Sequence, residues 1–157
     1  MKEALRALEL KVPPVALAVL VALVMWGASL LVPPVAAPST VRVASAAVLW
    51  LAGAGISLAG VFAFRRAKTS VNPTKPDSVS ALVSGGIYRV TRNPMYLGFL
   101  LMLLGWAAFL WSIAAAVVAM SFVLYMNRFQ IAPEERALAA RFGAEFSAYK
   151  ARVRRWL

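Results

Sequence analysis

Two polar motifs in an otherwise apolar chain carry the side chains that could do chemistry. The first runs from Gly85 to Gly98 and contains glycines, tyrosines, arginines, Asn93 and Pro94. Glycine permits backbone conformations that side chains disfavour, and Pro94 favours the start of a helix. A tyrosine ring can stack on a base, and arginines can hold the charges of a zwitterionic ligand. The same residues are also typical of an ordinary interfacial belt at the end of a membrane helix.

The second motif is the adjacent pair Glu134 and Glu135, two of only six acidic residues in the chain. On a helix they lie four and three residues before Leu138, so both flank the apolar stripe. Pro133 followed by two acidic residues is also an ordinary helix start. Because the chain has no Cys and no His, the mixture of cationic and anionic groups favours binding of a zwitterionic cofactor over covalent or metal catalysis.

The composition indicates that a membrane surrounds these motifs. Apolar residues make up 62% of the 157 residues, against about 45 to 50% in soluble domains. The net charge is +11, but the 17 Lys and Arg residues flank apolar runs instead of following one continuous face. We therefore expect anionic membrane lipids as the partners of these charges, and no nucleic acid.

Two apolar runs predict the first two membrane spans, at about 12–32 and 41–64. Prolines separate them, and the segment before the first span suits a short interfacial anchor helix over 1–11. A cleaved signal peptide is disfavoured because the first apolar run is longer than a signal core. The polar stretch 65–95 contains too many helix breakers to be a span, so it is predicted to be the main cytoplasmic loop.

The next apolar run predicts a hairpin of two spans. Residues 97–126 are uncharged, and as one helix they would reach about 45 Å and overshoot the bilayer. A turn near Trp111 and Ser112 gives spans at about 96–111 and 113–131. Four spans place the three basic segments on one side of the membrane, whereas three spans would export the basic tail. Both termini are therefore predicted to be cytoplasmic.

The tail over 133–155 has the pattern of an amphipathic interfacial helix, because apolar residues recur every three or four positions among Lys and Arg. The apolar positions are Leu138, Phe142, Phe146, Tyr149, Val153 and Trp156. The predicted fold class is an all-α integral membrane protein, with four transmembrane helices plus this C-terminal amphipathic interfacial helix in a single domain over 1–157.

With these motifs the chain resembles the superfamily of isoprenylcysteine carboxyl methyltransferases and phospholipid methyltransferases, which are integral membrane enzymes. The resemblance covers residues 72 to 155, and the first two predicted spans carry no signature of the family. The matching residues are Asn72, Pro73, Leu82, Val83, Gly86, Tyr88, Arg92, Pro94, Tyr96, Gly98, Glu134, Glu135, Leu138, Phe142, Gly143, Phe146 and Tyr149.

The resemblance implies transfer of a methyl group from S-adenosylmethionine to a lipidic or small hydrophobic acceptor, which enters from the bilayer at the cytoplasmic face. The acceptor group is a carboxylate, an amine or a thiol, and a bacterial inner membrane is the implied location. The implied catalytic residues are Glu135 with Arg92 or Arg128, the arginine orienting an anionic acceptor. The implied cofactor-binding residues are Leu82, Val83, Tyr88, Asn93, Pro94, Met95, Tyr96, Leu97, Glu134 and Glu135. No metal is implied.

Two positions depart from the eukaryotic prenylcysteine enzymes, which have His where this chain has Asn93 and Ser80. An asparagine amide donates hydrogen bonds but does not titrate near neutrality, so these changes weaken the case for prenylcysteine as the acceptor. Phospholipid amines, fatty acids and small thiols stay open. The alternatives to an enzyme of this family are a non-enzymatic membrane protein and, with less support, a membrane reductase.

Overall fold

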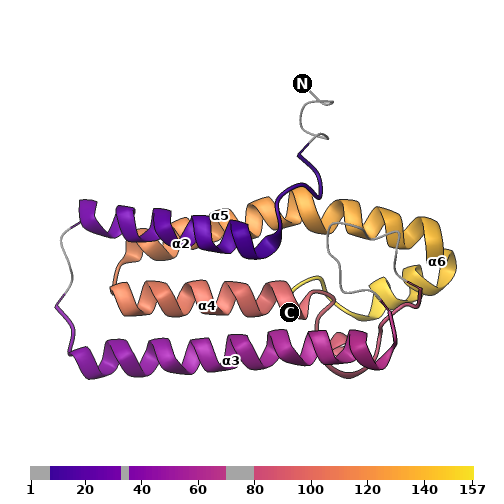
Figure 1. The fold of residues 1–157 in the computed structure, drawn as a ribbon, viewed down its shortest axis with the longest axis horizontal. Helices are drawn as coiled ribbons and strands as arrows, with labels where there is room; N and C mark the ends of the chain where they lie inside the picture. The colour runs from indigo at the N-terminus through magenta and orange to yellow at the C-terminus, as the bar shows by residue number, and fades with distance from the viewer. Residues whose placement is uncertain (1–7, 33–35, 70–79) are drawn as a thin grey trace.

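The computed structural model describes residues 8–32, 36–69 and 80–157, which form an elongated bundle of helices (Figure 1). The described residues are helical and contain no strand, which confirms the predicted all-α class. Most of the predicted anchor helix over 1–11, and the family residues Asn72 and Pro73, lie outside the described residues.

The first two helices begin at prolines, as the sequence suggests. Helix α2, Pro14–Leu31, has a proline in its first turn, where a missing backbone N–H costs nothing. Helix α3, Ser39–Arg66, follows Pro38 and ends at Ala67. Both are long and apolar enough to cross a membrane, and they begin and end within a few residues of the predicted spans.

The third and fourth helices form the predicted hairpin. Helix α4, Pro94–Leu110, ends at Trp111, which adopts the left-handed conformation with φ 52°. Helix α5, Ile113–Tyr125, begins after Ser112, whose hydroxyl accepts a hydrogen bond from the Ala115 N–H at 3.2 Å. A left-handed residue followed by a serine N-cap reverses the chain in two residues. Helix α4 is apolar but, with 17 residues, shorter than the other candidate spans.

Helix α4 lies at the centre, with α3 on one side and the α2–α5 pair on the other (Figure 1). Gly53 and Gly98 let α3 and α4 approach closely: a Cβ on Gly98 would lie 2.0 Å from Ser57 Oγ and 2.4 Å from the Gly53 oxygen. By contrast, a Cβ on Gly55 would meet nothing within 4 Å. Gly53 therefore allows α3 to pack closely against α4 within the molecule, as small residues commonly do between membrane helices.

The fourth span continues without a break into the tail through the π-helix η3, Met126–Ile131, and helix α6, Ala132–Arg152. Pro133 explains the π turn, because its ring would clash with the carbonyl of Phe129 in a regular α-helix and it has no N–H to donate there. The freed Phe129 carbonyl instead accepts a hydrogen bond from the Leu10 N–H at 3.0 Å. The N-terminal segment is thereby attached to the end of the fourth span.

The predicted interfacial helix over 133–155 is helical, but it is not straight. Gly143 has φ 49° and ψ −116°, which bends α6 in its middle, and such a conformation is readily adopted by glycine. After the bend the chain turns back toward the start of α4 (yellow in Figure 1). The second half of the tail therefore packs against the loop before α4.

Candidate functional site

The two sequence motifs meet at the end of the bundle where α4 begins and α5 passes into α6. The Tyr96 hydroxyl, on the first turn of α4, donates a hydrogen bond to Glu134 Oε1 at 2.5 Å. Arg92 Nη2, two residues before that helix, donates to Glu135 Oε1 at 2.7 Å. The hairpin thus brings the Tyr and Arg motif and the glutamate pair into direct contact.

Glu134 lies among neutral hydrogen-bond donors. Besides Tyr96, Gln130 of the π-helix donates from Nε2 to Glu134 Oε1 at 2.7 Å. Burial raises the pKa of Glu134 to about 7, and the charge of Glu135 adds to the rise, against the lowering effect of the two hydrogen bonds. Glu134 lies just past the fourth predicted span. Because its pKa is about 7, its carboxyl group changes charge near neutral pH.

Glu135 lies among cations. Arg155 Nη2 donates to Glu135 Oε2 at 2.7 Å and its Nε to Oε1 at 3.2 Å, in a two-pronged contact. Lys150 Nζ lies 3.8 Å from Oε2. Burial alone would raise the pKa of Glu135, but the hydrogen bonds and charges of Arg155 and Arg92 outweigh it and lower the pKa. Glu135 is thus an ionised partner of two arginines.

Arg92 also makes backbone contacts that fix its position. Its Nη1 donates to the carbonyl oxygens of Val153 at 2.7 Å and Lys150 at 3.0 Å. The Nε of Arg92 is buried and has no hydrogen-bond partner in the described part of the chain. A buried guanidinium N–H without an acceptor is costly, so this donor is available to an anionic group of a ligand.

Most of the remaining predicted site residues lie around these charges. Leu82, Val83 and Tyr88 pack in one apolar cluster with Phe146 and Tyr149 of the bent half of α6. The Tyr149 hydroxyl donates to the Tyr88 carbonyl at 2.8 Å, and burial raises the pKa of Tyr149 to about 12. The cluster thus places these three predicted cofactor-binding residues against the bent half of α6.

The predicted contact residues at the start of α4 point in different directions. The Asn93 amide Nδ2 donates to the Arg155 carbonyl at 2.8 Å. Pro94 and Met95 lie against Gly60 of α3, and Leu97 is buried. Of this stretch, Tyr96 is the residue that contacts a glutamate side chain directly.

Arg128, a predicted candidate for orienting the acceptor, lies apart from these groups. It is exposed and its Nη1 donates to Glu9 Oε1 at 2.7 Å, while Arg136 pairs with the other oxygen of Glu9. The arginines that contact Glu135 are Arg92 and Arg155.

Three residues that no sequence motif singled out complete the site: Gln130, Asn127 and Arg155. Asn127 Oδ1 accepts hydrogen bonds from Arg155 Nη1 at 3.3 Å and Trp156 Nε1 at 3.1 Å. Gln130 and Thr91 are the buried polar residues of the described chain. A polar residue inside an apolar span, four positions before a glutamate, is the signal that could have identified Gln130.

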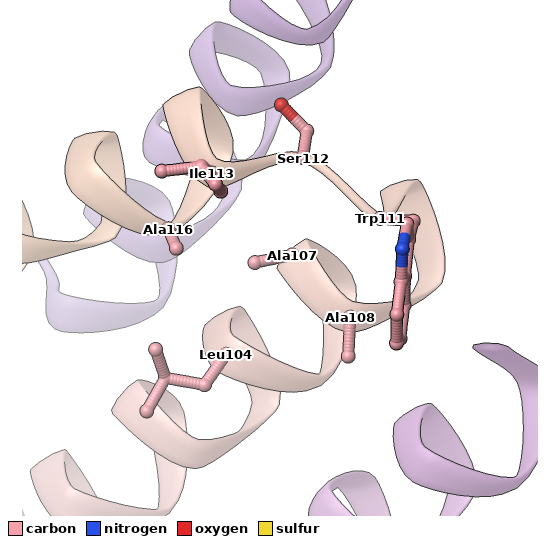
Figure 2. A pocket seen from close by; sticks show the side chains of 7 residues that line it. All are labelled: Leu104, Ala107, Ala108, Trp111, Ser112, Ile113 and Ala116. Atoms are coloured by element: carbon pink, nitrogen blue, oxygen red, sulfur yellow. The ribbon is translucent and has the colours of Figure 1, made fainter. Parts of the chain in front are cut away.

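A hollow of about 420 Å³ lies at the other end of α4, at the turn into α5 (Figure 2). It is lined by Leu104, Ala107, Ala108, Trp111, Ser112, Ile113 and Ala116. Its lining is almost entirely apolar, and helix α4 separates it from the glutamates. No metal-binding group of three or more His, Cys, Asp or Glu residues occurs within residues 8–32, 36–69 and 80–157.

Comparison with known proteins agrees with the motifs. The family model of phospholipid methyltransferases matches residues 41–145. The chain belongs to the phospholipid methyltransferase family. Membership in this family indicates a methyltransferase, and the long apolar helices indicate a membrane protein. The matched region contains the Tyr and Arg motif and both glutamates, but ends before the last residues of the tail.

An uncharacterized protein of Haemophilus influenzae is 48% identical over 63 residues, which is 40% of this chain and 100% of that protein. No solved structure matches the chain.

Proposed function

We propose that this member of the phospholipid methyltransferase family transfers a methyl group from S-adenosylmethionine to a hydrophobic acceptor at the cytoplasmic face of a bacterial inner membrane. The observation that carries the proposal is the meeting of Tyr96 and Arg92 with Glu134 and Glu135 at one end of the bundle. The predicted topology has both termini on the cytoplasmic side, which follows from the distribution of Lys and Arg.

The residues at this end suit such a cofactor. S-adenosylmethionine supplies a methyl group on a positively charged sulfur, in a molecule that also carries an amino-acid zwitterion and an aromatic base. Glu134 offers a negative charge in a poorly hydrated position, and Arg92 Nε offers an unused donor to a carboxylate. The partly exposed side chains of Leu82 and Val83, which pack beside the buried Tyr88, provide an apolar surface for the base.

The chain's own contribution to catalysis would be alignment and proton transfer. Holding two reactants in line contributes about 7 to 11 kcal/mol in favourable cases. A carboxylate acceptor is already ionised and needs no base. An amine or thiol acceptor must lose a proton, and Glu134 is suited to accept it because its pKa of about 7 lies close to neutral pH.

The test is calorimetric binding of S-adenosylmethionine and S-adenosylhomocysteine to detergent-purified protein at pH 8, where Glu134 is ionised. We expect both to bind, and we expect Glu134→Gln to weaken the binding of S-adenosylmethionine more than that of S-adenosylhomocysteine, whose sulfur carries no positive charge. The glutamine carbonyl can still accept the hydrogen bonds of Tyr96 and Gln130, so this variant should fold.

The matched control is Glu145→Gln, which removes an exposed carboxylate from the same helix and should bind both ligands normally. A well-folded unmodified protein that binds neither ligand would contradict the proposal and favour the non-enzymatic membrane protein.

A further inference from the structure

The last residues of the chain, 153–157, leave α6 and run past the start of α4; we call them the C-terminal strap. Their backbone accepts hydrogen bonds from the loop before α4. The Arg92 N–H donates to the Arg154 carbonyl at 3.0 Å, and the Thr91 hydroxyl donates to the Arg155 carbonyl at 3.3 Å. The Asn93 amide and the Arg92 guanidinium also donate to carbonyl oxygens of the strap. Each of residues 91 to 93 is therefore hydrogen-bonded to the strap.

Side chains of the strap reach the two other elements of the site. Arg155 holds Glu135 of α6 with two nitrogens and also contacts Asn127 of the π-helix. Trp156 donates to the same Asn127 oxygen. The strap therefore connects the loop before α4 with the π-helix and the start of α6, which lie far from that loop along the chain.

These contacts are specific in geometry. A guanidinium that donates through two nitrogens to one carboxylate fixes both distance and orientation, which a lysine cannot do. If the Arg155 side chain were shortened, Glu135 would keep its ion pair with Arg92. Without the contact to Arg155, however, the Glu135 side chain could rotate away from its present position. The Arg92 side chain, held by Glu135 and by Val153 of the strap, would lose part of its support as well.

We propose that the C-terminal strap is part of the methyl-donor site and that Arg155 is a positioning residue, which holds Glu135 and, through it, Arg92 in the arrangement that binds the donor. This inference rests on the proposed function. It extends the site beyond residues 41–145, the region shared with the family model.

The experiment compares the affinity for S-adenosylhomocysteine of the unmodified full chain, Arg155→Gln, Arg155→Lys and Arg152→Gln, well below the unfolding temperature of each. Loss of a charged hydrogen-bond partner predicts an affinity about tenfold or more lower for Arg155→Gln. Arg155→Lys keeps the positive charge but cannot donate to Glu135 through two nitrogens, so we expect it to fold normally and to bind with intermediate affinity. Arg152 is exposed, lies in α6 before the strap and donates to the Ala148 carbonyl of its own helix, so Arg152→Gln should bind within about twofold of the unmodified chain.

A second measurement separates positioning from folding. In protein labelled with ¹⁵N-tryptophan, the indole signal of Trp156 reports on the strap, and those of Trp50 and Trp106 report on the helix bundle. We expect Arg155→Gln to shift the Trp156 signal and leave the other two in place. A variant with all three signals unchanged and undiminished affinity would overturn the inference, as would a folded Arg155→Lys that binds as tightly as the unmodified chain. Absence of binding by the unmodified chain would instead contradict the proposed function, and this inference with it.

Discussion

Glu134 and Glu135 are neighbours in the chain, yet they belong to two chemically different regions. One residue along a helix is a rotation of about 100°, and that rotation turns Glu134 toward the neutral donors of α4 and the π-helix, and Glu135 toward the arginines of the loop and the strap. The pKa of the first carboxyl is raised to about 7, whereas that of the second is lowered.

The opposite pKa shifts show that Glu134 and Glu135 do not form a single acidic patch. Glu135 has its charge neutralised by partners within the protein, so its contribution is to organise the surrounding residues. Within the described part of the chain, Glu134 accepts its hydrogen bonds from the neutral groups of Tyr96 and Gln130, so its charge is available to a positively charged ligand or to a proton. The two glutamates should therefore respond differently to the same substitution.

The largest contrast is expected for stability. Glu135→Gln leaves Arg92 and Arg155 without a charged partner in a partly buried position, so we expect a loss of about 1–3 kcal/mol in the free energy of unfolding. Glu134→Gln keeps its hydrogen bonds and should be as stable as the unmodified protein, or more so, at pH 8. Denaturant unfolding in detergent measures both. Equal losses for the two variants would show that the glutamates share one environment.

The next contrast concerns pH. Because the folded pKa of Glu134 is raised from 4.5 to about 7, its contribution to stability is fully present below 4.5 and is lost as the pH rises toward 7. Glu135 acts in the opposite direction: its contribution is present above 4.5 and lost as the pH falls through its lowered folded pKa.

We therefore expect the stability of Glu134→Gln relative to the unmodified protein to increase between pH 5 and pH 8. Unfolding measured across this range, with Glu145→Gln as the reference, checks the sign. A difference that stays constant with pH would mean that Glu134 does not titrate in this window.

A smaller effect is expected from Tyr96→Phe, which removes one donor from Glu134 without changing the helix packing. The lost hydrogen bond predicts a destabilisation of about 0.5–1.5 kcal/mol. Since this hydrogen bond lowers the pKa of Glu134, the variant should also shift the pH dependence to higher pH. Unchanged pH dependence in this variant would argue against contact between the two side chains.

The smallest effect is expected on the Glu135 side from Asn93→Ala. This variant removes the single hydrogen bond from the Asn93 amide to the Arg155 carbonyl. We expect the free energy of unfolding to fall by about 0.5–1 kcal/mol, with no change in the pH dependence of stability that Glu134 causes. Thermal unfolding at pH 6 and pH 8 tests both statements. A pH-dependent difference here would mean that the two regions are coupled.

The helices were predictable because their signals are local. Uncharged apolar runs gave the spans, and the length of the run at 97–126 required a turn, which lies at Trp111 and Ser112 as expected. The hairpin places the start of α4 near the end of α5, and Tyr96 and Arg92 meet the glutamates there. By contrast, the bend at Gly143 depends on one glycine adopting a positive φ within an otherwise regular amphipathic pattern.

The remainder of the site depends on long-range contacts that no periodicity reveals. Arg155 reaches Glu135 because α6 bends and the chain after it turns back, and Arg128 pairs with Glu9, which is far from it along the chain. The sequence contains many arginines in basic segments, and charge alone does not tell which of them reaches the glutamates.

The attachment of Leu10 and Glu9 to the end of the fourth span has a consequence for biosynthesis. Both residues are made before the first span, but their partners, Arg128, Phe129 and Arg136, are made more than a hundred positions later, the Glu9–Arg128 pair being separated by 119 residues. Proteins generally fold from the N-terminus during synthesis, but these contacts cannot form until the chain has been made through Arg136. Closure of this contact is therefore a late step of assembly, and it would mark the molecules in which the hairpin has reached its final orientation.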